Sequence, residues 1–166
     1  MAADAPAIFA MSRQAGMREW LPDQVYADLD QAREIVCRLI GFYATPDPRV
    51  TPVVLGVCAP DGPLIGHVGL SRLGDAIEIG YAIDEAQRGR GFATAAVCAM
   101  TRWGLVAFAL PSIDAIVAAD NLGSCTVLER AGFVKIGEAH RPLHGVTRLV
   151  RTYRVAVRRD TSCSTT

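Results

Sequence analysis

The segment Gln87-Arg88-Gly89-Arg90-Gly91-Phe92-Ala93 separates an alternating apolar stretch from a long apolar helical pattern. It is therefore predicted to be a strand-to-helix turn, where free amide N–H groups and the positive end of a helix dipole converge. The glycines let the backbone approach a ligand closely, and Arg88 and Arg90 add positive charge. The segment predicts an anion site, although taken alone it also fits a glycine-rich turn with solvated arginines.

Two common nucleotide-binding motifs do not fit this turn. A dinucleotide fingerprint of the form GxGxxG would need a glycine where Thr94 stands, and a phosphate-binding P-loop needs a Gly-Lys-Ser/Thr sequence that the chain lacks. The sequence therefore matches neither motif.

The elements on either side of the turn follow from the periodicity of apolar residues. Residues 14–42 are expected to be helical with an interruption at Trp20-Leu21-Pro22. Three strands, at 53–59, 64–72 and 75–84, form an antiparallel meander before the turn. After it we expect a helix over 91–109, a strand over 113–119, a helix over 122–131 ended by Gly132, and strands over 133–137 and 147–157. This order predicts an α/β (α+β) fold with a mixed, mostly antiparallel sheet.

Alternation also predicts how the second and third strands pair. A tight turn at residues 73–74 brings the apolar residues of both strands to one face. The same register places Gly69 opposite Glu78 and His67 opposite Gly80 on the other face. Glu78 and His67 are therefore expected to lie close together.

Length and composition limit the possible classes of protein. The chain has 166 residues, about half of them apolar, which predicts a single domain over 1–166, with residues 1–13 and 158–166 poorly ordered. With 17 basic and 17 acidic residues, no overall charge favours nucleic acid or a membrane surface. Without a signal-like start or a long apolar run, we expect a soluble, cytoplasmic protein. The five scattered cysteines predict free thiols rather than disulfides or a zinc site.

Two motifs carry a resemblance to a known family. Arg88-x-x-Gly91-x-Ala93 resembles the Q/R-x-x-G-x-G/A signature of the GNAT superfamily of N-acetyltransferases. The run from Asn121 to Phe133 resembles the NxxSxxVLExxGF segment of the branch that includes the ribosomal-protein-alanine acetyltransferases of the RimJ/RimL type. Residues 64–66 and 78–81 are also similar to that branch, and the likeness covers about residues 53–137.

The resemblance implies a GNAT-like sheet with splayed central strands and an acyl-coenzyme A, usually acetyl-CoA, as donor. The pyrophosphate would bind the amides of the glycine turn, and the pantetheine arm would lie like an added strand between residues 77–84 and 113–119. Asn121 matches a residue that contacts the pantetheine, and it is equally suited to cap a helix. The implied donor-binding residues are Ile79, Tyr81, Ile83, Arg88, Gly89, Arg90, Gly91, Phe92, Ala93, Asn121 and Ser124.

Acyl transfer to an amine needs a base for the amine and a proton for the departing thiolate. Glu78 breaks an apolar pattern and matches a position where the branch often carries a carboxylate, so it is the candidate base; it is also a common kind of exposed strand residue. His67 is a weaker candidate on the substrate side, since a lone histidine is more often structural. Many GNAT enzymes place a tyrosine where Leu128 stands here, which leaves Ser124 as candidate acid or simply a residue of the first helical turn.

The sequence departs from the family at its start, where only Ala7–Ala10 could form a first edge strand. The expected activity is acetyl transfer from acetyl-CoA to a primary amine, which could be a protein N-terminus, a polyamine or another small amine. The alternatives are a non-catalytic acyl-CoA-binding module and a transferase using another acyl-CoA such as succinyl-CoA. A homodimer is an expectation from the family, and no metal is implied.

Overall fold

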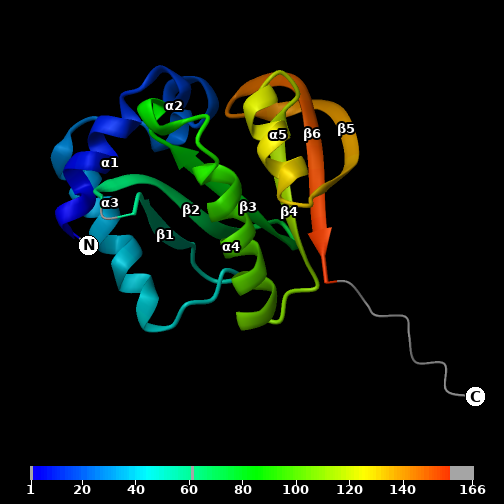
Figure 1. Cartoon of the computed structure of the whole chain (residues 1–166), viewed down its shortest axis with the longest axis horizontal. Helices are drawn as coiled ribbons and strands as arrows, with labels where there is room; N and C mark the ends of the chain where they lie inside the picture. The colour runs from blue at the N-terminus through cyan, green and yellow to red at the C-terminus, as the bar shows by residue number, and fades with distance from the viewer. Residues whose placement is uncertain (1, 61, 158–166) are drawn as a thin grey trace, which may run out of the picture.

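The computed structural model describes residues 2–60 and 62–157 (Figure 1). Three short 3₁₀ turns and three helices come first: η1 (Ala2–Asp4), α1 (Ala5–Ser12), α2 (Ala15–Trp20), η2 (Pro22–Gln24), α3 (Leu29–Gly41) and η3 (Phe42–Ala44). Three strands follow in succession, then helices separated by one strand, then two strands: β1 (Val53–Cys58), β2 (Leu64–Leu73), β3 (Ala76–Ile83), η4 (Glu85–Gln87), α4 (Phe92–Ala107), β4 (Ser112–Ala118), α5 (Leu122–Arg130), β5 (Val134–Leu143) and β6 (Val146–Ala156).

One six-stranded sheet, in the order β1-β2-β3-β4-β6-β5, runs through the molecule. Every neighbouring pair is antiparallel except β3 and β4, which are parallel because α4 connects them. The main core lies between one face of the sheet and α4 and α5, where Leu70, Ile79 and Val97 are buried. On the other face Ala82 packs with Met11 of α1 and Met17 of α2. The predicted fold class is confirmed.

The pairing of β2 with β3 differs from the predicted register by two residues. Leu73 pairs with Ala76, so the turn consists of Gly74 and Asp75, and Gly74 takes a left-handed φ of 59°. A shift by two keeps each side chain on its predicted face but changes its partner. Glu78 lies opposite Ser71 instead of Gly69, and His67 lies opposite Ala82 instead of Gly80. The two residues therefore do not lie side by side.

The parallel strands β3 and β4 separate soon after they meet. Within these two described strands the only paired residues are Glu78 and Asp114. Because the strands are parallel, their later residues diverge in the same direction and leave an opening through the middle of the sheet. Asp114 is buried at the fork, and its carboxylate oxygens accept hydrogen bonds of 2.6 and 2.8 Å from Arg154 of β6. The ion pair between Asp114 and Arg154 thus joins β4 to β6 at the fork.

The start of the chain is helical and contains no strand. Residues Ala7–Ala10, the candidate first edge strand, belong to α1, where Pro6 stands in the first turn and favours a helix start. Ala5, Met11 and Ser12 are buried, so this helix packs against the rest of the fold. The edge strand next to β2 is β1 instead, and β5 forms the opposite edge of the sheet.

The other predicted elements are confirmed with small shifts at their ends. β5 is longer than predicted, reaching Leu143, and Gly132 follows α5 with a left-handed φ of 87°. The free cysteines of the described residues are Cys37, Cys58, Cys98 and Cys125; Cys163 and the predicted frayed end at 158–166 lie outside that part. None of the described helices is long and apolar enough to cross a membrane.

Candidate functional site

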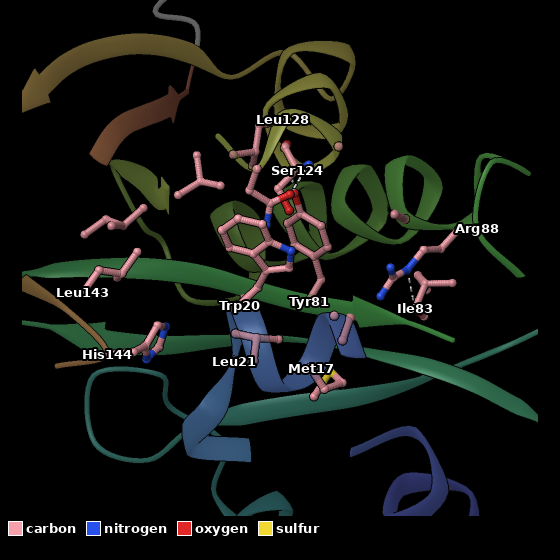
Figure 2. Close-up of a pocket in the computed structure, with 18 residues that line it drawn as sticks. Met17, Trp20, Leu21, Tyr81, Ile83, Arg88, Ser124, Leu128, Leu143 and His144 are labelled. Atoms are coloured by element: carbon pink, nitrogen blue, oxygen red, sulfur yellow. Dashed lines mark hydrogen bonds between the residues drawn. The ribbon is translucent and has the colours of Figure 1, made fainter. Parts of the chain in front are cut away.

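A cavity of about 240 Å³ occupies the opening between β3 and β4. Gly80, Tyr81, Ala82 and Ile83 line it from β3, and Ile116 and Val117 from β4. Figure 2 shows that Arg88 and Ile83 lie at one end of this space, Trp20 and Tyr81 in its middle, and Leu143 and His144 at the opposite end. We call the part at Arg88 the donor end and the part at His144 the acceptor end.

The donor end leads to the glycine turn before α4. Gly89 and Gly91 have left-handed φ angles of 75° and 84°, and no heavy atom lies within 4 Å of where their Cβ atoms would stand. Open space therefore adjoins the backbone just where the first amides of a 16-residue helix have no helical partner. This geometry supports the predicted anion site, with amides and helix dipole pointing the same way.

The two arginines of the turn are arranged differently. Arg88 lines the cavity, and its guanidinium is held by the carbonyl oxygen of Ile83 at 3.3 Å and by Glu85 at 3.6 Å. It also fits tightly against Gly16 of α2, because a Cβ there would meet a guanidinium nitrogen at 2.6 Å. Arg90 instead bonds Gln87 and covers the ring of Phe92, with 5.1 Å between guanidinium carbon and ring centre. Arg88 is thus the arginine placed for a ligand in the cavity.

The start of α5 forms the next part of the wall. Asn121 caps the helix, since its side-chain oxygen accepts the amide of Ser124 at 3.1 Å, and both residues line the cavity. The capping role that the sequence allowed is therefore present, and it leaves the side chain at the cavity. The Tyr81 hydroxyl donates to the carbonyl oxygen of Ser124 at 3.1 Å, and burial raises the pKa of Tyr81 to about 12. Tyr81 is therefore a protonated phenol at neutral pH.

Glu78 lies at the fork of the opening and is only partly buried. It does not line the cavity itself, which begins two residues later on β3. Burial raises the pKa of its carboxyl group, while a hydrogen bond from Ser71 and the charge of His144 act in the opposite direction. A carboxylate with a raised pKa is a stronger base, so the environment suits the predicted role without establishing it.

His67 is not brought to the cavity. Its partner on β3 is Ala82, and its Nδ1 atom is buried without a hydrogen-bond partner among the described residues. Burial lowers the pKa of His67 to about 4, so the side chain is neutral under ordinary conditions. The predicted position of His67 beside Glu78 is wrong because the register is shifted; His67 belongs to the face that α1 and α2 cover and does not line the cavity.

The acceptor end contains residues that sequence patterns did not identify as a site. Trp20 and Leu21 come from the end of α2, and Leu143 and His144 from the end of β5 and its turn. Arg148 of β6 lies over the Trp20 ring, 5.4 Å from its centre, which ties the two segments together. The sequence predicted residues 20–22 only as the interruption of a helix and gave no readable pattern for residues 140–147, because nothing local signals that the two segments meet.

The predicted donor-binding residues divide into three groups. Tyr81, Ile83, Arg88, Ala93, Asn121 and Ser124 line the cavity. Gly89, Arg90, Gly91 and Phe92 form the turn and helix start that lead to it. Ile79 is buried in the main core, on the α4 side of the sheet, and does not line the cavity.

Comparison with protein families identifies a family whose domain includes the residues of this site. The model of the acetyltransferase (GNAT) domain matches residues 1–134, which include the glycine turn, both strands of the opening and the start of α5. The chain belongs to the GNAT acetyltransferase family. The splayed parallel strands and the glycine turn are therefore features of a GNAT domain, as the resemblance implied.

Individual proteins agree with this GNAT assignment. The chain is similar to Probable N-acetyltransferase YjcK of Bacillus subtilis, with 40% identity over 87 residues that make up 50% of this chain and 48% of that protein. The chain thus aligns with about half the length of that relative. Its fold is similar to a ribosomal-protein-S5-alanine acetyltransferase from Vibrio fischeri (TM-score 0.79, 23% identity, 93% of this chain and 88% of the other). It is also similar to a spermidine N-acetyltransferase from Vibrio cholerae solved with CoA and spermine (TM-score 0.75, 19% identity, 93% and 90%).

The site holds no cluster that would suggest a metal centre. In residues 2–60 and 62–157 no group of three or more His, Cys, Asp or Glu side chains converges as metal ligands. The groups that could do chemistry at the cavity are instead two hydroxyls, of Ser124 and Tyr81, one imidazole, of His144, and the carboxylate of Glu78 at the fork.

Proposed function

We propose that this chain transfers an acetyl group from acetyl-CoA to a primary amine by direct attack of the amine on the thioester. The observation that carries the proposal is that one cavity passes through the opened sheet, with the glycine turn at one end and a separate wall of side chains at the other. Two substrates entering from opposite ends would meet between β3 and β4. A single binding pocket for one ligand would not need both ends.

The donor end fits coenzyme A in shape and charge. The open backbone at Gly89 and Gly91 suits a pyrophosphate, and Arg88 adds a fixed positive charge. The unpaired edges of β3 and β4 beyond the fork can bond the amides of a pantetheine arm, as in the addition of a strand to a sheet. Tyr81, Ile83 and Asn121 would border that arm.

The reaction requires the removal of two protons from an amine that arrives as an ammonium ion. One proton must leave before the nitrogen attacks the carbonyl carbon. As the C–N bond forms and the C–S bond breaks, the thiolate takes a proton to give free CoA, which balances the second one lost by nitrogen. We assign Glu78 to attract the ammonium and accept its first proton, directly or through water, and Ser124 to donate to the sulfur.

The acceptor is a primary amine such as a protein N-terminus, a polyamine or another small amine. The motif from Asn121 to Phe133 favours a RimJ/RimL-like enzyme acting on a protein N-terminus. The structural neighbours include a ribosomal-protein-S5-alanine acetyltransferase and a spermidine N-acetyltransferase, which is consistent with either acceptor class. We further propose that the protein works in the cytoplasm and forms a homodimer.

Two alternatives remain distinct from this proposal. A module that binds acyl-CoA without catalysis is favoured by Leu128, which stands where many family members have a tyrosine. A donor other than acetyl-CoA, such as succinyl-CoA, would use the same turn and strands but would need room for a longer acyl group.

The test is to incubate the protein with acetyl-CoA and a panel of amines that includes short peptides with a free N-terminus and polyamines. We expect release of free CoA, detected by its thiol, and a product that mass spectrometry shows to be heavier by one acetyl group. Replacement Glu78→Gln should slow the reaction by about 100-fold, within the range that general base catalysis supplies. Binding of acetyl-CoA without any turnover would favour the non-catalytic module, and turnover only with succinyl-CoA would change the donor.

A further inference from the structure

The hairpin between β5 and β6 brings a histidine to the acceptor end. Leu143 pairs with Val146, so the turn consists of His144 and Gly145, and both have left-handed φ angles, 50° and 77°. Two such residues in sequence are typical of a type I′ turn, whose twist matches that of the strands it joins. Residues other than glycine are uncommon in this conformation, and histidine is among the few that are enriched in it, together with asparagine and aspartate. The turn thus places an imidazole at the cavity at some conformational cost.

The imidazole is fixed by a carboxylate from a distant part of the chain. Nδ1 of His144 lies 2.6 Å from Oδ2 of Asp23 in η2, a contact between residues 121 positions apart. The His144 side chain is 26% exposed and that of Asp23 is 77% exposed. Because a carboxylate accepts hydrogen bonds, Nδ1 carries the proton in the neutral ring and Nε2 is left with its lone pair. The pair has the arrangement by which a carboxylate orients a histidine base.

The charged groups around His144 favour a positive acceptor. Asp23 lies at its Nδ1, and Glu78 is close enough for the charge of His144 to lower the pKa of the Glu78 carboxyl. On the neighbouring strand the guanidinium of Arg148 is occupied over the Trp20 ring, 5.4 Å from its centre. An ammonium group beside the His144 imidazole would therefore also be attracted by the negative charges of Asp23 and Glu78, although neither carboxylate lines the cavity.

We propose that His144 is a catalytic residue that accepts a proton from the acceptor amine through Nε2, and that Asp23 is its positioning residue. The inference rests on the proposed function and changes one step of it: Glu78 attracts the ammonium at the fork, and His144, which lines the cavity, replaces Glu78 as the acceptor of the first proton. The neutral nitrogen then attacks the thioester carbon, the C–S bond breaks, and the sulfur receives the second proton. His144 returns its proton to solvent through its exposed part.

The turn itself supplies a matched variant. His144→Asn creates an Asn-Gly pair, the preferred sequence for this turn, and keeps an N–H group that can donate to Asp23. The hairpin should therefore form as before, while the side chain at position 144 can no longer accept a proton. We expect turnover at pH 7 to fall about 100-fold, with the KM for acetyl-CoA unchanged. His140→Asn, which alters an exposed histidine four residues earlier on β5, is the control and should keep wild-type turnover.

A second variant separates proton transfer from structure. His144→Gly also suits the left-handed turn, and added imidazole should restore its turnover at least about tenfold if a proton acceptor is what was lost. Asp23→Asn should lower turnover and move the pH dependence of kcat/KM, because the ring loses its fixed tautomer. The role of His144 would be overturned if His144→Asn kept wild-type turnover at every pH. It would also be overturned if imidazole had no effect on the turnover of His144→Gly. Absence of wild-type turnover with any amine would instead overturn the proposed function, and the inference with it.

Discussion

The two ends of the cavity are built in different ways. The donor end comes mainly from two short continuous segments, residues 88–93 and 121–124, with Ile83 of β3 and Gly16 of α2 beside Arg88, and its main groups are backbone amides and left-handed glycines. The acceptor end comes from residues 20–23 and 143–148, which side-chain contacts join across 121 positions of sequence. The donor can thus be held largely by local motifs, while the acceptor end depends on tertiary contacts between distant segments.

This difference predicts which properties each set of mutations changes. Changes at the donor end should alter the affinity for acetyl-CoA whatever the amine. Changes at the acceptor end should alter turnover and the choice of amine while leaving acetyl-CoA binding intact. If mutations at the acceptor end weakened acetyl-CoA binding, or mutations at the donor end changed only the choice of amine, the cavity would not be divided in this way.

The largest effect is expected from a negative charge in the glycine turn. Gly91→Asp introduces a carboxylate at the helix N-terminus where the pyrophosphate should bind, and aspartate tolerates the left-handed φ of 84° there better than most residues. Repulsion between the charges should weaken acetyl-CoA binding about 100-fold, or about 2.7 kcal/mol. Isothermal titration with CoA measures the change directly.

Gly132→Asp is the matched control for that variant. Gly132 also has a left-handed φ, 87°, with no heavy atom within 4 Å of a Cβ, but it lies at the other end of α5 from the cavity-lining Asn121. Both substitutions carry the same backbone cost, so a similar loss of affinity in the two variants would mean that the glycine turn does not bind the donor.

A smaller effect is expected where the donor meets the chemistry. Ser124→Ala removes the hydroxyl proposed to donate to the sulfur, and kcat should fall about 30-fold with little change in the KM for acetyl-CoA. Thr126→Val is the control, since that hydroxyl lies on the same helix and donates to the carbonyl oxygen of Leu122. If kcat is unchanged in Ser124→Ala, the cap formed with Asn121 is the main role of this position, and Tyr81 becomes the remaining hydroxyl at the cavity.

The two arginines of the turn allow a finer test. Arg88→Gln removes a charge held at the cavity wall, and the KM for acetyl-CoA should rise about tenfold, as for one charge-assisted hydrogen bond. Arg90→Gln removes a charge engaged with Gln87 and Phe92, and should raise KM less than about threefold. Steady-state kinetics at two salt concentrations measure both. Equal effects would indicate that Arg90 swings toward the ligand.

Most of the fold could be predicted because apolar periodicity and turn residues act locally. Alternation fixed which face of β2 and β3 is apolar, but a slip by two residues leaves those faces unchanged, so the partners of Glu78 and His67 were predicted wrongly. The helical start was missed for a related reason. Ala7–Ala10 has no clear alternation, and Pro6 in the first helical turn was a signal that could have identified α1.

The residues that line the cavity at its donor end include several that the sequence singled out, whereas those at its acceptor end were not singled out. Arg88, Asn121 and Ser124 occur in motifs whose spacing is set by one turn or one helix start. Trp20 and His144 reach the cavity only because α2 packs on the sheet and the β5–β6 hairpin folds over its opening. The pair His144-Gly145 did contain a usable sign, since a two-residue turn with glycine second predicts a tight hairpin. Nothing in the sequence pairs it with Asp23.

The smallest effect on turnover is expected at His67 of β2, which does not line the cavity. His67 has a pKa lowered to about 4 by burial, against 6.5 when unfolded, so its neutral form stabilises the fold above pH 6.5 and this contribution is lost as pH falls toward 4. Between pH 7 and pH 5 the loss amounts to about 2 kcal/mol. His67→Leu should remove this part of the acid sensitivity and leave kcat unchanged, because His67 does not line the cavity. Urea unfolding at the two pH values measures it, with exposed His140→Leu as control. A fall in kcat without a change in the pH dependence of stability would place His67 at the acceptor end after all, and would remove the distinction drawn between it and His144.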